Sequence, residues 1–186
     1  MSDPIRIGVI GCRVGERWVA GAKSGEDTIA LAVADLNQDL ARQAAELHSV
    51  PNIYSDYRDL LADCDIDAVG IATNPDVRKQ MILDALDAGK HVLVQKPHGR
   101  NAADVEEINA AAEKSGKTLA YAYFMRHEVE NKRTRQIIAD GGIGSPYHAR
   151  VNYYFRERRT AEPPPPGSTW LYQWGLKGGA LGQHGS

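Results

Sequence analysis

The residues best suited to chemistry begin with a glycine-rich turn close to the N-terminus. An apolar run over 5–10 is followed by Gly11, Cys12, Arg13, Val14 and Gly15. In dinucleotide-binding folds such a turn lets backbone N–H groups approach a pyrophosphate at the start of a helix. These five residues, with Gly8 of the preceding run, are therefore candidate cofactor-binding residues. The expected pattern Gly-x-Gly-x-x-Gly is one glycine short, and a plain tight turn would use similar residues, so the turn alone leaves both interpretations open.

An acidic residue follows at the spacing that a dinucleotide site requires. Asp35 ends a second apolar run, Thr28–Ala34, about twenty residues after the glycine turn, where an acid hydrogen-bonds the adenosine ribose. An ordinary strand-end aspartate before a helix is the alternative. Leu36 and Asn37 follow instead of an arginine, so a 2′-phosphate has no evident partner. The sequence therefore favours NAD over NADP as the cofactor.

A lysine follows another apolar run directly. Gln95, Lys96 and Pro97 come after His91–Val94, at the expected carboxyl edge of a sheet, where ligands bind in open α/β folds. If burial and neighbouring charge lower its pKa, Lys96 could donate a proton to a substrate oxygen as a general acid. A surface lysine in a strand–helix loop is the alternative, and the residues leave both interpretations open.

Apolar runs and helical stripes alternate along the first two thirds of the chain. Strands are expected over 5–10, 28–34, 67–72, 91–94 and 118–121. Helical stripes are formed by Leu40, Ala44 and Leu47, by Val77, Met81, Ala85 and Ala88, and by Val105, Ile108 and Ala112. Helix N-caps are expected at Asn37, within 73–75 and at Asn101. Because strands alternate with helices, the predicted fold class is α/β, a Rossmann-type doubly wound parallel sheet.

The pattern changes near residue 124. A helix is expected over 129–140, and alternating apolar and polar residues over 146–157 indicate a strand with one buried face. We therefore predict a dinucleotide-binding Rossmann domain over 1–123 and a partial α+β open-sheet domain over 124–186. If Ser186 is the natural end, the strand lacks partners in the sequence. The chain is then interpreted as truncated in its second domain, and the uncovered strand could pair two copies in a homo-oligomer.

Composition and charge exclude several classes of function. A net charge of −2 gives no electrostatic case for binding nucleic acid or an anionic membrane. Cys12 and Cys64 form neither a disulfide framework nor a zinc pattern, and the six histidines lack metal-ligand spacing, so no metal site is expected. No signal peptide or membrane-spanning run is evident. We expect a cytoplasmic protein whose partner is a small-molecule substrate.

Several segments together resemble one known family. They are the glycine turn, Asp35 and the segments 72–75, 88–97, 124–126 and 178–181. These segments are similar to those of the glucose–fructose oxidoreductase, inositol dehydrogenase and MocA (Gfo/Idh/MocA) family, and 88–97 is the most specific of them. The resemblance implies a Rossmann domain followed by an open-faced sheet domain. It also implies hydride transfer between a nicotinamide and a sugar, polyol or related hydroxy or carbonyl compound.

The resemblance implies further site residues. Cofactor-binding residues would include Thr73, Asn74, Pro75, Gln95, Lys96 and Pro97, substrate-binding residues would be Lys96, Arg126, Gln183 and His184, and catalytic residues would be Lys96 and His184. Some positions depart from the family. Gln95 replaces its glutamate, Arg78 stands where members often have a histidine, and Gln183 stands at an aspartate position. These departures keep open the alternatives of a non-catalytic dinucleotide-binding or regulatory protein and of an inactive fragment.

Overall fold

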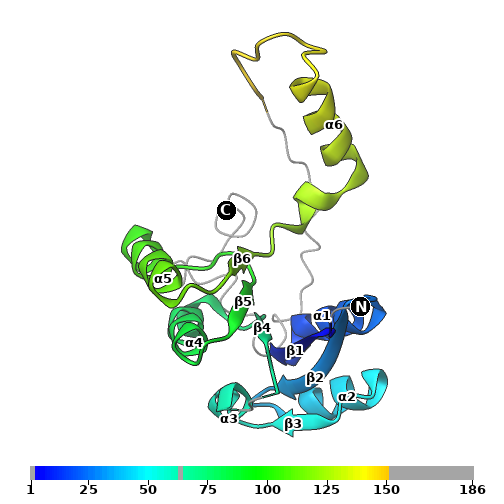
Figure 1. Cartoon of the computed structure of the whole chain (residues 1–186), viewed down its shortest axis with the longest axis vertical. Helices are drawn as coiled ribbons and strands as arrows, with labels where there is room; N and C mark the ends of the chain where they lie inside the picture. Colours follow the sequence, from blue (N-terminus) through cyan, green and yellow to red (C-terminus); the bar gives the residue numbers. More distant parts are fainter. Residues whose placement is uncertain (1–2, 63–64, 151–186) are drawn as a thin grey trace, which may run out of the picture. The chain divides into compact units, whose positions relative to one another are not determined.

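The structure, a computed structural model, describes residues 3–62 and 65–150 and contains one parallel six-stranded sheet (Figure 1). The strands are β1 (Ile5–Ile10), β2 (Thr28–Ala34), β3 (Asn52–Tyr54), β4 (Ala68–Ile71), β5 (His91–Val94) and β6 (Leu119–Tyr121). Their order across the sheet is β3-β2-β1-β4-β5-β6, and every neighbouring pair is parallel. The α/β Rossmann-type fold class is therefore confirmed, since this order defines a doubly wound sheet.

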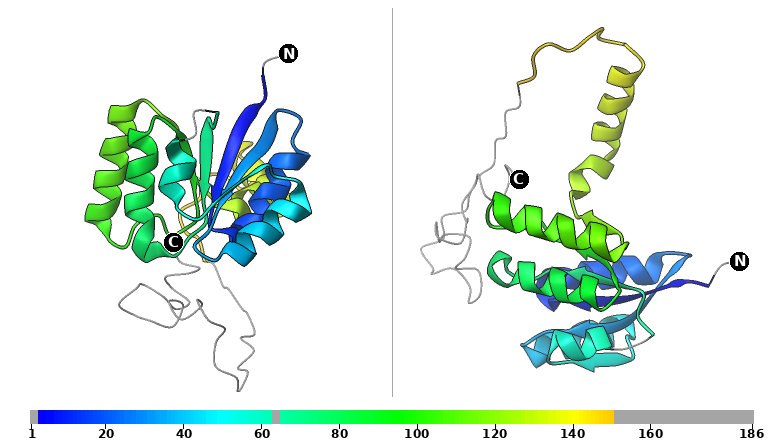
Figure 2. Two further views of the ribbon diagram at one scale, coloured as in Figure 1. Left: turned by 90° about the horizontal axis from the view of Figure 1, so that it is seen from below. Right: turned by 60° about the vertical axis from the view of Figure 1, so that its left-hand side comes forward.

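Helices cover both faces of this sheet (Figure 2). They are α1 (Cys12–Ser24), α2 (Gln38–His48), α3 (Tyr57–Ala62), α4 (Pro75–Asp87) and α5 (Ala102–Ser115). Two expected caps are confirmed, because the Asn37 side chain accepts hydrogen bonds from the first turn of α2 and the Asn101 side chain accepts one from Asp104 in α5. Gly89 and Gly116 follow α4 and α5 with positive φ, which is the usual way to end a helix.

The sheet separates two apolar cores, because successive strand residues point to opposite faces. Val9 and Val33 pack with α1 and α2, in a cluster that includes Val19, Ala41 and Ala44. Their neighbours Ile10 and Ala34 belong to the other cluster, which contains residues of α3, α4 and α5. Both faces of the parallel strands are thus buried, which explains the continuous apolar runs in the sequence.

Two of the expected helical stripes are partly wrong. In α2 the buried residues are Ala41, Ala44 and Ala45, whereas Leu47 is 65% exposed. In α4 the buried face consists of Pro75, Arg78, Ile82, Ala85 and Leu86. Val77 on that helix and Ala88, the residue that caps its C-terminus, are exposed. The face of α4 that packs on the sheet therefore includes a cation, and an apolar pattern alone could not identify it.

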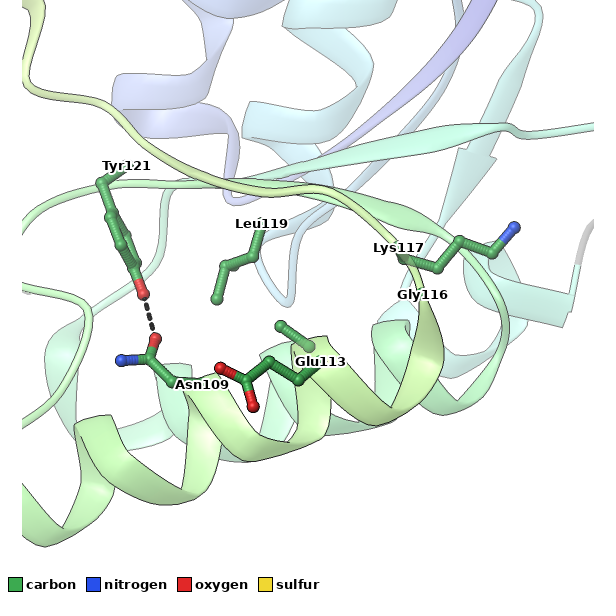
Figure 3. Close-up of a pocket in the computed structure, with 7 residues that line it drawn as sticks. Asn109, Glu113, Gly116, Lys117, Leu119 and Tyr121 are labelled. Carbon is green, nitrogen blue, oxygen red and sulfur yellow. Dashed lines mark hydrogen bonds between the residues drawn. The ribbon is translucent and has the colours of Figure 1, made fainter.

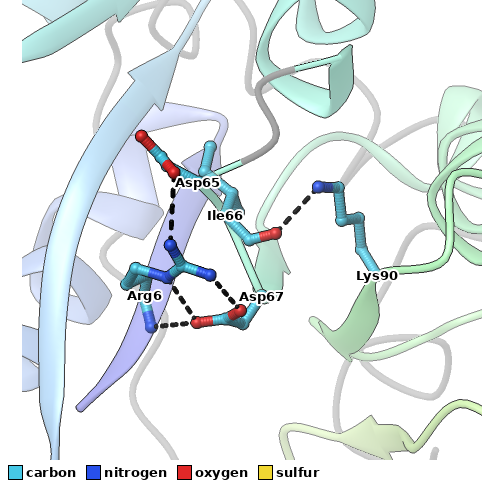
Figure 4. Close-up of polar contacts among 5 residues, drawn as sticks. All are labelled: Arg6, Asp65, Ile66, Asp67 and Lys90. Atoms are coloured by element: carbon cyan, nitrogen blue, oxygen red, sulfur yellow. Dashed lines mark hydrogen bonds and ion pairs between the residues drawn. The ribbon is translucent and has the colours of Figure 1, made fainter. Parts of the chain in front are cut away.

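A polar network joins the strands at their amino ends (Figure 4). The guanidinium of Arg6 donates two hydrogen bonds to Asp67, of 2.8 and 2.7 Å, and one of 3.3 Å to Asp65. The Lys90 ammonium donates to the carbonyl of Ile66 at 2.8 Å. The Arg6 guanidinium holds the pKa of Asp67 well below its usual range. This network links β1 to the residues that lead into β4 and β5.

Residues 123–150 belong to a second compact unit, which begins at Tyr123. It contains a 3₁₀ helix, η1 (Phe124–His127), and α6 (Val129–Ala139), close to the helix expected over 129–140. Residues 146–150 form no strand in the structure, and the rest of the strand expected over 146–157 lies outside the described residues. Within 3–62 and 65–150, none of the helices is long and apolar enough to cross a membrane.

Candidate dinucleotide site

The carboxyl ends of four strands bring the predicted site residues to one edge of the sheet. Gly11 follows β1 and its N–H donates to Ala34 of β2 at 2.8 Å. Thr73 follows β4 after Ala72, and Gln95 follows β5 with its N–H donating to Ile71 of β4 at 2.9 Å. The strand order reverses at β1 and β4, and open α/β folds bind ligands at such a switch point. The edge is therefore the candidate site.

At both glycines of the turn a larger side chain would be sterically unfavourable. Gly11 has φ of 92°, and a Cβ at this position would lie 2.9 Å from the carbonyl carbon of Ala72. A Cβ at Gly15 would lie 2.7 Å from Cγ1 of Val9, so glycine lets α1 pack directly on β1. Helix α1 begins at Cys12, immediately after Gly11. The turn is thus one residue shorter than Gly-x-Gly-x-x-Gly. Gly11 allows the tight turn, as the first glycine of that pattern does, and Gly15 allows close packing of helix on strand, as its last glycine does.

The carboxylate of Asp35 lies at the N-terminus of α1. Its Oδ2 accepts a hydrogen bond from the Cys12 N–H at 2.7 Å, and its Oδ1 accepts one from the Asn37 N–H at 2.8 Å. The first turn of a helix has N–H groups without partners inside the helix, and the helix dipole makes this end positive. The structure therefore joins the two features that the sequence analysis selected separately. Arg13 and Val14, both exposed, continue this first turn.

Two of the predicted cofactor-binding residues have structural roles of their own. Gly8 lies within β1, where a Cβ would be 2.9 Å from Cδ2 of Leu60, so packing beneath α3 explains its lack of a side chain. Gly8 thus has a packing role within β1, and its predicted contact with a cofactor stays a prediction. Cys12 is buried. This burial, and to a lesser extent the charge of Asp35, raises the pKa of its thiol to about 12. Cys12 therefore presents no thiolate to a ligand, and its backbone N–H is donated to Asp35.

Lys96 lies in the loop after β5. Its backbone N–H donates to the side-chain oxygen of Gln95 at 2.9 Å, and its peptide bond to Pro97 is cis. The side chain is half-buried, and burial together with the Arg78 guanidinium lowers the pKa of its ammonium. The His98 ring packs on Tyr121 with a centroid distance of 3.9 Å. Burial and Arg78 also lower the pKa of His98.

The structural role of Arg78 was not predicted from the sequence. Its side chain is 2% exposed, and its guanidinium donates hydrogen bonds to the carbonyls of Thr73, Gln95 and Pro97. Burial lowers its pKa to about 10, an effect that the Asp76 carboxylate opposes. The guanidinium is thus still charged at neutral pH. A signal was present, because Arg78 falls on the same face of α4 as the apolar Ile82, but a sequence does not show what a buried cation contacts.

The remaining predicted site residues are Asn74 and Pro75, which directly follow Thr73 at this edge, and Arg126, Gln183 and His184. Asn74 is the N-cap residue of α4, but its side chain makes no capping hydrogen bond, and Pro75 begins the helix. Arg126 is exposed in η1, in the unit that begins at Tyr123. Gln183 and His184 lie outside the described residues, as does Cys64. Their predicted roles stay predictions.

A hollow of about 430 Å³ lies along α5 and β6 (Figure 3). Its lining residues are Asn109, Ala112, Glu113, Gly116, Lys117, Leu119 and Tyr121. The Tyr121 hydroxyl donates to the side-chain oxygen of Asn109 at 2.7 Å, which joins the helix to the strand. These residues come from the outer end of the sheet, and not from the glycine turn or the loop that carries Lys96.

Comparison with known proteins supports the family that the motifs resemble. The model of the Gfo/Idh/MocA family, described as an oxidoreductase family with an NAD-binding Rossmann fold, matches residues 5–123. Oxidoreductase YrbE of Bacillus subtilis is 33% identical over 165 residues, which are 88% of this chain and 47% of that protein. Myo-inositol 2-dehydrogenase of Thermotoga maritima is 29% identical over 162 residues, which are 87% of this chain and 47% of that protein.

Solved structures show the same fold. A scyllo-inositol dehydrogenase from Lactobacillus casei with bound NAD(H) and scyllo-inositol has a TM-score of 0.73 and 24% identity, and the match covers 76% of this chain and 43% of that one. A 3-ketoreductase from Actinomadura kijaniata in complex with TDP-benzene and NADP has a TM-score of 0.69 and 28% identity over 75% of this chain and 44% of that one. The chain spans about half the length of the curated relatives just named. It belongs to the Gfo/Idh/MocA family of oxidoreductases with an NAD-binding Rossmann fold.

Proposed function

We propose that this chain binds NAD at the carboxyl edge of its sheet, as the cofactor-binding part of an oxidoreductase that acts on a sugar, polyol or related compound. The observation that carries the proposal is the Asp35 carboxylate hydrogen-bonded at the N-terminus of α1. This arrangement puts an acceptor for ribose hydroxyls beside N–H groups suited to a pyrophosphate. The substrate class follows from the resemblance, and relatives that are named as inositol dehydrogenases support it.

The choice of NAD over NADP depends on the end of β2. A carboxylate at Asp35 would accept hydrogen bonds from a ribose diol and would repel a 2′-phosphate. The next side chain, Leu36, is 90% exposed, and the side chain of Asn37 is engaged in capping α2. The two solved relatives were crystallised with different dinucleotides, NAD(H) and NADP, so the family alone does not decide the choice.

Lys96 is the proposed proton donor and acceptor. A bound nicotinamide supplies or receives the hydride. In the reducing direction the Lys96 ammonium donates a proton to the carbonyl oxygen of the substrate, and in the oxidising direction the neutral amine accepts the hydroxyl proton. The lowered pKa of this lysine supports both roles, because it brings the neutral amine closer to neutral pH. Gln95, in place of a glutamate, adds no negative charge that would oppose this effect.

The rest of the assignment is proposed on the resemblance. We assign 1–123 to the cofactor domain and 124–186 to a partial substrate domain. Arg126, Gln183 and His184 are the proposed substrate contacts, and His184 is a second proposed catalytic residue. A small molecule is the proposed partner, and pairing of two chains through the second domain and a cytoplasmic location are proposed with it.

Calorimetric titration of the chain with NAD and with NADP tests the proposal. We expect binding of NAD, weaker binding of NADP, and a loss of NAD affinity of at least about tenfold in Asp35→Ala, since charged hydrogen bonds contribute about 1.5–3 kcal/mol. Asp39→Ala is the matched control, because Asp39 is an exposed aspartate of α2 that pairs with Arg42. Equal affinity in the two variants would contradict the proposal. NAD binding without turnover of sugars or polyols would favour a non-catalytic dinucleotide-binding protein.

A further inference from the structure

Arg78 is a buried cation whose described hydrogen bonds go to backbone carbonyls and to no carboxylate. Its Nη1 donates to the carbonyl of Gln95 at 2.9 Å and also to that of Pro97, and its Nη2 donates to that of Thr73. Its Nε is buried without a hydrogen-bond partner among the described residues. Removing a charged group from water costs several kcal/mol unless partners compensate for it. Arg78 is only 2% exposed, so its hydrogen bonds to these carbonyls must compensate for the lost hydration.

The three carbonyls belong to two separate loops. Thr73 follows β4, and Gln95 and Pro97 follow β5, so one guanidinium ties the loops after neighbouring strands to α4. The carbonyls of Gln95 and Pro97 flank Lys96 in the chain. A planar fork with five N–H donors suits this task, whereas a lysine ammonium in the same place is a point charge with a different geometry.

We propose that Arg78 is the positioning residue of this edge: its guanidinium joins the loops after β4 and β5 and thereby fixes the backbone that carries Lys96. The charge of Arg78 acts on the same lysine, since it lowers the pKa of Lys96 as burial does. The titratable groups that bear on this cluster are Arg78 and Asp76 of α4 and Lys96 and His98 of the loop. The Asp76 carboxylate raises the pKa of Arg78, against the lowering by burial.

Two variants separate the geometry of Arg78 from its charge. Arg78→Lys keeps a cation but loses the fork, and Arg78→Met loses both while filling similar space. Arg42→Met is the control, because Arg42 is an exposed arginine of α2. That Arg78 fixes the loop after β5 does not depend on the proposed function. That this loop positions Lys96 for proton transfer rests on the proposed function. Both measurements below use the full chain without cofactor, so failure to bind NAD and failure of this inference are separate results.

The first measurement is amide hydrogen exchange by NMR at Gln95 and Lys96. We expect exchange about 10- to 100-fold faster in Arg78→Lys and in Arg78→Met, since hydrogen bonds from a charged donor are lost, and no change in Arg42→Met. The amide of Val9 in β1 reports whether the sheet is intact. If Arg78→Met does not fold, Arg78→Lys decides the outcome. Unchanged exchange at Gln95 and Lys96 in a folded Arg78 variant would overturn the proposal.

The second measurement is the pH dependence of Lys96 acylation by acetic anhydride, followed by mass spectrometry, with exposed Lys114 as the reference in the same chain. Arg78→Met should raise the midpoint of the Lys96 curve, because a neighbouring cation is removed, and Arg78→Lys should leave it low. A merely structural role would not give this difference between two variants that both loosen the loop. Equal midpoints in the two variants would refute the effect of the Arg78 charge on Lys96.

Discussion

Replacing Gly15 by alanine tests whether close packing of α1 on β1 sets the position of the candidate site. The added Cβ would lie 2.7 Å from Cγ1 of Val9, which is fully buried, and 3.3 Å from Cβ of Ala72. Valine is short and branched, so the helix must move away from the strand instead. Overpacking of this kind costs about 1–3 kcal/mol, and alanine returns about 0.5–1 kcal/mol through its helix propensity. We therefore expect a net loss of about 0–2.5 kcal/mol in the free energy of unfolding.

Gly21→Ala is the matched control on the same helix. Gly21 lies in α1, and a Cβ at this position would meet no described atom within 4 Å other than its chain neighbours and the backbone of its own helix. Alanine should therefore raise stability by about 0.5–1 kcal/mol. Urea unfolding followed by circular dichroism gives both values. Because Gly15→Ala displaces the start of α1, it should also weaken NAD binding, whereas Gly21→Ala should not. A Gly15→Ala variant as stable as Gly21→Ala would refute the packing argument.

Three further predictions follow from the structure. Lys96→Met should lower kcat at least about 100-fold in the reaction proposed above, with a much smaller change in the affinity for NAD measured by calorimetry. Asp67→Asn should cost about 1 kcal/mol of stability at neutral pH, because Asp67 is partly exposed in its pair with Arg6. The pKa of Asp67 is held low in the folded state, so this contribution is present above the unfolded pKa of about 4 and is lost as the pH falls below it. Urea unfolding at a series of pH values should show the two proteins converging in acid. Asn101→Ala should cost about 1 kcal/mol by removing the acceptor for the Asp104 N–H, and a thermal melt that leaves Tm unchanged would contradict this.

Apart from β3 and α3, which the sequence analysis did not include, the alternation of strands and helices and the position of Asp35 could be predicted from the sequence. Parallel strands buried on both faces leave long apolar runs, and the spacing from Gly11 to Asp35 places both at one edge of the sheet. The missing glycine was also visible in the sequence. What the sequence did not show is that α1 begins at Cys12 and that Gly15 takes up the close packing against Val9.

The face of α4 and the part played by Arg78 could not be predicted in this way. Hydrophobic periodicity assumes that the buried face of a helix is apolar, so it favoured Val77 and Ala88, which are exposed. The buried face contains Arg78 because carbonyls of two loops accept its hydrogen bonds. Those loops are adjacent only in the folded sheet, and a single sequence does not show which backbone groups meet a cation.

The most direct test of the proposed site is NMR mapping of amide shifts in the 186-residue chain during titration with NAD. We expect the shifts to concentrate at Gly11–Val14, at Asp35 and in the loop that carries Lys96, which all lie at the carboxyl edge. The network of Arg6 and Asp67 at the opposite edge should be unaffected. Absence of shifts at a saturating concentration of NAD, or shifts confined to the amino edge, would contradict the proposed site.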